Sequence, residues 1–196
     1  MSKSVAILGK GPSVLRSTKE FIDSFDEVAG CGMPLFKGYE QYIGNRLHYH
    51  FANQTGTPYT KEEEEELGIK QLINTADRTP IRDNFNYKDL DPSTGILAFD
   101  FFVQQSEYTE IGLIGFDLFQ TMQKMYYFKN EEFDPAVDWL WKNGTYDHKG
   151  RLTRVSLHNT EKTYEYFNHV FDTNQDKKFY IISSYPFVAK DNVEVL

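Results

Sequence analysis

The stretch DPSTGILAFDFFVQQSEYTEIGLIGFD, residues 91–117, decides the fold. It predicts a polar turn over Pro92–Gly95, an amphipathic helix over Gly95–Gln105 and a buried strand over Ile111–Phe116. The N–H groups and the dipole of a helix start favour an anion. We therefore expect Ser93, Thr94 and Gly95 to hold a carboxylate or a phosphate, with an ordinary helix cap as the alternative.

Short apolar runs alternate with helical patterns on both sides of this stretch. Together with residues 111–116, strands are predicted over residues 4–8, 25–31, 47–52, 69–73 and 178–183. Helices are predicted from Pro12 or Ser13 towards Phe25, over Lys61–Leu67 with a Thr60–Glu63 capping box, and over Asn159–Phe171. This order predicts an α/β fold, a single Rossmann-like domain over residues 1–196 whose mostly parallel sheet is flanked by helices. The irregular aromatic stretch 119–152 predicts a small lid.

Composition restricts the class of protein. The 196 residues are 40% hydrophobic and carry a net charge of −8, which indicates a folded globule and disfavours nucleic-acid or membrane-surface binding. No apolar run reaches the ~20 residues that span a bilayer, and no signal peptide is recognisable. A lone cysteine, Cys31, predicts a reducing, cytoplasmic location. The pattern indicates no particular oligomeric state.

A glycine-rich turn, Gly9-Lys10-Gly11-Pro12-Ser13, follows the first strand. Glycines let backbone approach a ligand closely, and a following helix offers its N-terminus to a phosphate. A tight strand-to-helix turn without a ligand is the alternative. The turn does not match a Walker A motif, and Val14 stands where a dinucleotide fingerprint has its third glycine. Val14 and the lack of an acidic residue after the second strand disfavour a nicotinamide-dependent oxidoreductase.

Acid–base chemistry has one main candidate, His158, placed directly before the helix that Asn159 caps. Helical spacing puts Glu161 and Glu165 near it, and a histidine oriented in this way is suited to act as a general base near neutral pH. A capping or surface histidine is the alternative.

Tyr126 and His148 carry hydrogen-bond donors that can stabilise a leaving phosphate without a metal. The alternative for the aromatic residues of the lid is that they only pack against the core and one another. His48 and His50 lie at i, i+2 on a predicted strand, with no nearby cysteine and no Asp-x-Asp pair in the sequence. The sequence therefore predicts no metal site.

Read together, these motifs resemble the sialyltransferases in two of their branches. Residues 4–13 look like the bacterial strand followed by Gly-Asn-Gly-Pro-Ser, and residues 92–117 resemble the small sialylmotif of the eukaryotic branch. Residues 116–128 look like a bacterial segment whose tyrosines touch the donor phosphate, and residues 146–148 are placed like the third sialylmotif. His158 falls where both branches keep a basic histidine, and residues 178–186 resemble the following strand and turn.

The resemblance implies a glycosyltransferase-A-variant-like fold and an inverting, metal-independent transfer without a cofactor. The donor would be CMP-sialic acid or a related CMP-linked keto sugar, and the acceptor a glycan hydroxyl. His158 would be the base, and Ser93, Thr94 and Gly95 would hold the sugar carboxylate. Tyr126 or His148 would stabilise the leaving phosphate. The turn formed by Gly9, Lys10, Gly11, Pro12 and Ser13 would hold the nucleotide.

Three positions depart from the family pattern. Lys10 and Gly32 stand where the bacterial branch has asparagines that contact the donor, and Thr163 stands where the eukaryotic branch has its Glu. Two alternatives therefore stay open. One is a catalytically silent nucleotide- or carbohydrate-binding protein that retains the fold, and the other is a transferase that uses a different nucleotide-sugar donor.

Overall fold

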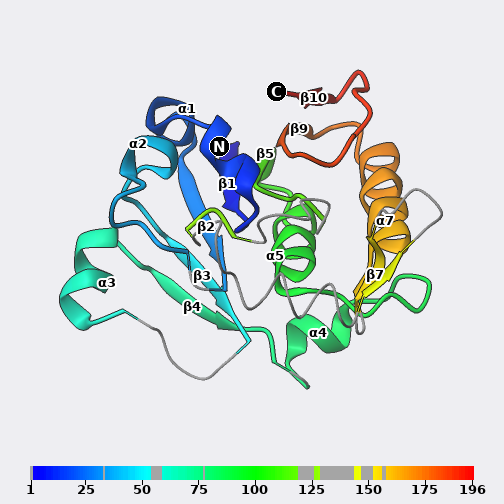
Figure 1. The fold of residues 1–196 in the computed structure, drawn as a ribbon, viewed down its shortest axis with the longest axis horizontal. Helices are drawn as coiled ribbons and strands as arrows, with labels where there is room; N and C mark the ends of the chain where they lie inside the picture. Colours follow the sequence, from blue (N-terminus) through cyan, green and yellow to red (C-terminus); the bar gives the residue numbers. More distant parts are fainter. Residues whose placement is uncertain are drawn as a thin grey trace.

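Seven parallel strands form the main sheet, in the order β10-β9-β5-β1-β2-β3-β4 (Figure 1). A computed structural model describes residues 2–32, 34–53, 59–76, 78–118, 126–128, 144–146, 152–155 and 158–196; for residues 144–146, 152–155 and 158 only the backbone is described. The strands are β1 (Lys3–Leu8), β2 (Glu27–Cys31), β3 (Tyr49–Ala52), β4 (Gln71–Asn74), β5 (Tyr108–Ile114), β9 (Lys178–Ile182) and β10 (Val193–Val195). The predicted α/β class and parallel sheet are confirmed, and every strand pair of this sheet is parallel.

Helices cover both faces of the sheet, which explains why its strands are nearly continuous apolar runs. In β1, Val5 and Ile7 face one core cluster, and Ala6 and Leu8 face the other. The first cluster lies under α5 (Thr94–Val103) and α7 (Thr160–Thr173). The second lies under the 3₁₀ helix η1 (Pro12–Arg16), α1 (Lys19–Asp23) and α2 (Glu40–Ile43), so the two helix groups flank the sheet on opposite sides (Figure 1).

One predicted helix is wrong. The stretch from Pro12 to Phe25 forms η1 and α1 instead of one helix. The chain is extended at Ser17, with φ −78° and ψ 169°, and the Thr18 side chain accepts the N–H of Phe21 to start α1. A capping side chain in mid-pattern thus ends one helix and begins another.

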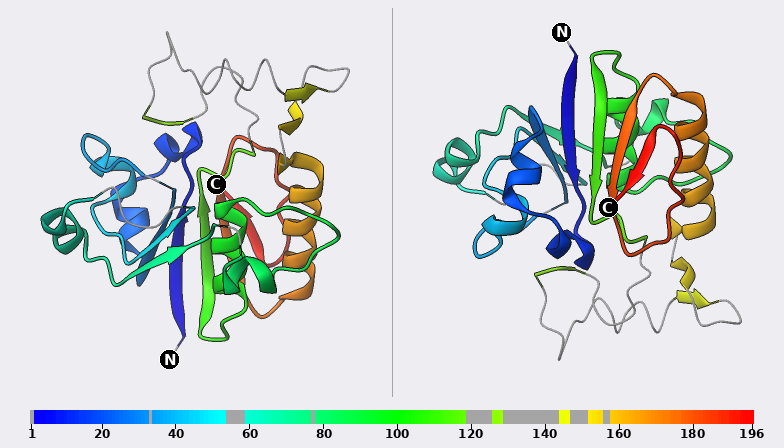
Figure 2. Two further views of the ribbon diagram at one scale, coloured as in Figure 1. Left: turned by 90° about the horizontal axis from the view of Figure 1, so that it is seen from below. Right: turned by 90° about the horizontal axis from the view of Figure 1, so that it is seen from above.

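The other predicted helices are confirmed within a residue or two. The remaining helices are α3 (Lys61–Leu67), with the predicted capping box between Thr60 and Glu63, and α4 (Pro80–Asn84), which the sequence pattern did not reveal. A small antiparallel sheet begins within the predicted lid and continues beyond it, with β6 (Gly144–Tyr146), β7 (Leu152–Val155) and β8 (His158–Asn159). Figure 2 shows β7 beyond one end of the main sheet, next to the start of α7. Most of the predicted lid, residues 119–152, lies outside the described residues.

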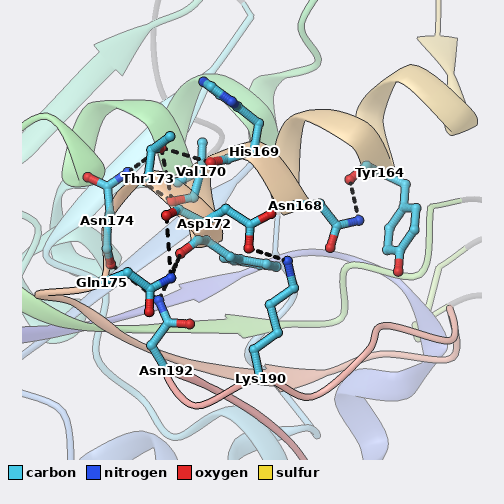
Figure 3. Close-up of polar contacts among 11 residues, drawn as sticks. Tyr164, Asn168, His169, Val170, Asp172, Thr173, Asn174, Gln175, Lys190 and Asn192 are labelled. Atoms are coloured by element: carbon cyan, nitrogen blue, oxygen red, sulfur yellow. Dashed lines mark hydrogen bonds and ion pairs between the residues drawn. The ribbon is translucent and has the colours of Figure 1, made fainter.

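The segment that connects β9 to the edge strand β10 contains no helix. Side chains of the connection instead tie it to the end of α7: the Lys190 ammonium lies 2.6 Å from a carboxylate oxygen of Asp172, and the Asn192 amide donates to the Phe171 carbonyl at 2.9 Å (Figure 3). The buried Asn192 bond holds the last turn of α7 against the sheet edge, and the Lys190–Asp172 pair is a surface contact beside it. In the part of the chain that is described, no helix combines the length and apolar character needed to cross a membrane.

Candidate functional site

The sheet reverses its strand order between β1 and β5, because β2 to β4 lie on one side of β1 while β5, β9 and β10 lie on the other. In open parallel sheets, ligands bind outside the carboxyl ends of the strands at such a switch point. The glycine-rich turn follows β1 and the Gly115-Phe116-Asp117 segment follows β5, so both lie at this position.

The two strand ends are in close contact. The Gly9 N–H donates to the Ile114 carbonyl at 2.7 Å, and the Gly11 N–H donates to the Gly115 carbonyl at 3.0 Å. A Cβ on Gly9 would lie 2.6 Å from the Gly115 carbonyl oxygen. The glycines of the turn are therefore needed for its approach to β5, and these two N–H groups already have acceptors.

Asp117 closes the same junction. Its carboxylate is buried, and Oδ2 accepts the Ser13 N–H at 2.9 Å while Oδ1 accepts the Ser184 N–H at 2.7 Å. A Cβ on Gly11 would collide with this carboxylate. Asp117 thus supplies the anion at the start of η1 and joins the ends of β1, β5 and β9.

Lys10 points towards the end of β2. Its ammonium lies 4.4 Å from the centre of the Tyr126 ring, and a Cβ on Gly32 would lie 2.8 Å from the same nitrogen. The neighbouring Cys31 is buried, which raises the pKa of its thiol to about 12, although the positive charge of Lys10 acts in the opposite direction. Cys31 is therefore a protonated core side chain.

The start of α5 lies at the same edge of the sheet. Ser93 caps the helix by accepting the Ile96 N–H at 3.4 Å, and the hydroxyls of Thr94 and Thr75 lie 3.2 Å apart. The N–H groups of Thr94 and Gly95 belong to the first helical turn and have no acceptor within the helix. Ser93 is therefore a helix cap, which is the alternative that the sequence leaves open. The N–H groups of Thr94 and Gly95 are in addition suited to bind an anion.

Phe116 joins this helix start to the rest of the edge. A Cβ on Gly95 would lie 3.0 Å from the Phe116 ring, whose other neighbour is Phe167 of α7 at a ring-centre distance of 6.0 Å. The Thr160 hydroxyl of α7 donates to the Leu118 carbonyl at 3.4 Å. The starts of α5 and α7 are thereby both held against the segment that follows β5.

His158 lies in β8, two residues before Thr160, so its backbone reaches the same edge. Asn159 caps α7 as predicted, because its side chain accepts the Lys162 N–H at 2.9 Å. The His158 side chain and the whole of His148 lie outside what is described. Their proposed roles stay predictions, as do those of the remaining site residues.

Two lower-ranked histidines occupy structural positions. His48 Nδ1 accepts the Val28 N–H at 2.9 Å, and burial lowers the pKa of this imidazole. His50 is fully buried, its Nε2 bonds the Gly32 carbonyl, and burial lowers its pKa too. Among the described residues, no group of three or more His, Cys, Asp or Glu side chains is placed to hold a metal ion. The expectation of metal independence stays a prediction.

With this geometry established, comparison with known proteins gives one result on the fold. No protein-family model matches the sequence, and no curated protein sequence matches it. The chain is similar in fold to a glycosyltransferase. The solved structure of MAf glycosyltransferase from Magnetospirillum magneticum AMB-1 aligns over all of this chain with a TM-score of 0.51 and 14% sequence identity. The alignment covers 34% of that protein, so this chain spans about a third of its length.

Sequence reasoning did not assign roles to Asp117, Tyr127 or His50. Asp117 lay within the decisive stretch, but its partners are about a hundred and about seventy residues away in sequence. The Tyr127 hydroxyl bonds both the N–H and the carbonyl of Leu35, and its own N–H donates to the Lys10 carbonyl at 2.9 Å. Such long-range contacts have no local sequence signal.

Proposed function

We propose that this chain is an inverting glycosyltransferase that needs no metal. It would move sialic acid or a related keto sugar from a CMP donor to a glycan hydroxyl. The fold likeness to a glycosyltransferase supports the coarser statement, a transferase of sugars. The finer statement, with its donor and its base, rests on the motifs of the sequence and on where their backbones meet.

One observation carries the proposal. Four segments that are far apart in sequence meet at the carboxyl edge of the sheet beside the switch point: the turn after β1, the start of α5, the segment after β5 and the start of α7. The resemblance associates these segments with the nucleotide, the sugar carboxylate, the tyrosines that touch the donor phosphate, and the base. Parallel topology brings strand ends and helix starts to this edge in any such sheet, so the support comes from the direct contacts that join these four segments there.

The proposed roles are those that the resemblance implies. The N–H groups of Thr94 and Gly95 and the dipole of α5 would receive the sugar carboxylate. His158 would accept the proton of the acceptor hydroxyl as the new glycosidic bond forms and the bond to the CMP oxygen breaks. Tyr126 or His148 would donate a hydrogen bond to the departing phosphate.

A catalytically silent nucleotide- or carbohydrate-binding protein is the second candidate. The observation in its favour is the engagement of the β1 turn, whose Gly9, Gly11 and Ser13 N–H groups all donate to other parts of the protein. Because these N–H groups are engaged, nucleotide binding at this turn would depend on the Lys10 side chain or on van der Waals contact with the turn. A silent protein would bind the nucleotide but would not release CMP from the donor.

Calorimetric titration with CMP, UMP, GMP and AMP tests the proposal without knowledge of the acceptor. We expect CMP to bind, and CMP-sialic acid to compete with it. Binding of another nucleotide in place of CMP would favour the alternative donor class. No binding of any nucleotide at millimolar concentration would refute both the transferase and the nucleotide-binding candidate.

A further inference from the structure

The ammonium of Lys10 occupies a space that most residues at position 32 would fill. Gly32 directly follows β2 with φ +71°, and a Cβ on it would lie 2.8 Å from Lys10 Nζ and 3.2 Å from Lys10 Cε. On the other side, the Tyr126 ring faces the ammonium with its centre 4.4 Å away. The cation is therefore placed between the backbone of one strand end and an aromatic face.

Both walls of this space are fixed by buried groups. The Gly32 N–H donates to the Phe51 carbonyl at 2.7 Å, and the Gly32 carbonyl is bonded by the His50 ring. Tyr127, only 1% exposed, bonds the Leu35 N–H and carbonyl at 2.9 and 2.8 Å through its hydroxyl. Its neighbour Tyr126 is thereby held beside Lys10, so the cation is positioned before any ligand arrives.

We propose that Lys10, Gly32 and Tyr126 form one anion subsite that receives a phosphate of the nucleotide, and that the absence of a side chain at Gly32 leaves the space in which the ammonium lies. This rests on the proposed function, because the phosphate belongs to the proposed donor. A side chain at position 32 would displace the ammonium, because its Cβ would lie 2.8 Å from Lys10 Nζ and the flexible end of the lysine would have to move. An ammonium has three donors and no acceptor, so it recognises negative charge and does not distinguish one base from another.

The experiment compares three variants by calorimetry with CMP and UMP at low and high salt. Lys10→Met keeps an unbranched stem and removes the charge. Gly32→Ala adds the methyl group that meets the ammonium. Gly68→Ala is the matched control, because Gly68 has nearly the same φ, +73°, and nothing lies within 4 Å of its Cβ position. Both alanines are therefore placed at a similar positive φ, which L residues rarely adopt, and thermal melts check that each variant is folded.

We expect Lys10→Met to weaken CMP and UMP by the same factor, about tenfold, as for the loss of one charge-assisted bond to a phosphate. Gly32→Ala should weaken both nucleotides similarly, and the double variant should be no weaker than Lys10→Met, since both changes remove the same contact. Gly68→Ala should bind like the wild type. Added salt should weaken the wild type more than Lys10→Met.

Three results would overturn the proposal: wild-type affinity in Lys10→Met, additive losses in the double variant, or a factor that differs between CMP and UMP. If the wild type binds nucleotide and Lys10→Met binds it equally well, only this subsite is refuted. If the wild type binds no nucleotide, the proposed function fails and the subsite fails with it.

Discussion

The carboxylate of Asp117 should be one of the most important single side chains for the stability of this fold. It is 4% exposed, and its two oxygens accept the N–H groups of Ser13 and Ser184 at 2.9 and 2.7 Å. These bonds connect β1, β5 and β9 at the edge where the candidate site lies. Asp117→Asn is the smallest change that tests them, because the amide has nearly the same shape as the carboxylate.

An amide keeps one acceptor oxygen and replaces the other by an NH₂ group, which would face a backbone N–H donor. One hydrogen bond to a charged group is lost, at about 1.5–3 kcal/mol, and one buried N–H is left without an acceptor. For a domain of this size, a loss of about 2 kcal/mol lowers Tm by about 4–8 °C. Asp117→Ala removes both acceptors and should cost more.

Thermal unfolding followed by circular dichroism, with urea titration as a second measure, gives the comparison. Asp172→Asn is the matched control, because its side chain is 61% exposed and pairs with Lys190 at the surface. We expect this control to change stability by at most about 0.5 kcal/mol. If Asp117→Asn has the same Tm as Asp172→Asn, the assignment of Asp117 as the residue that joins the three strands is refuted.

Three further predictions concern other groups. Although burial alone would raise the pKa of Glu27, its hydrogen bond from Tyr108 and its ion pair with Lys70 outweigh this effect and lower the pKa below 4.5. Glu27 then contributes stability that is present above its unfolded pKa and is lost as pH falls through its folded pKa. Between about pH 5 and 3, the Tm of Glu27→Gln should therefore fall less than the Tm of the wild type. An equal fall of Tm with pH in the two proteins would contradict this. The Cys31 thiol, with a pKa of about 12, should react with a disulfide reagent at pH 8 only after unfolding, and rapid labelling of the folded protein would disprove its burial. Donor turnover should survive excess EDTA, and loss of activity that magnesium or manganese restores would show that a metal is required.

Elements with a strong local pattern were predictable from the sequence. The apolar runs of the strands and the Thr60–Glu63 capping box depend on near neighbours; the capping box is present as predicted, and the predicted strands lie within three residues of their expected bounds, β5 at Tyr108–Ile114 instead of Ile111–Phe116. The break between η1 and α1 was missed because one side chain, Thr18, decides it. The edge strand β10 was missed because it is short and is held by Lys190 and Asn192 through contacts with α7.

The candidate site was predictable in part. Parallel topology brings the segments after β1 and β5 to one edge, and Ser93 caps α5 as its residue type suggests. The sequence did not reveal that Asp117 fills the anion position at the start of η1, since that contact depends on the tertiary fold. Nor did it reveal that the Lys10 side chain lies against Gly32.

The most direct test of the proposed function is the rate of CMP release from CMP-sialic acid in the presence of a glycan acceptor. His158→Ala is compared with His169→Ala, which removes an exposed histidine from the same region of the chain. The account predicts that the wild type and His169→Ala release CMP at the same rate. His158→Ala should be slower by about 10²–10⁴-fold, the usual loss for a positioned base, with unchanged affinity for CMP. Equal rates in all three proteins, or no release by the wild type, would contradict it.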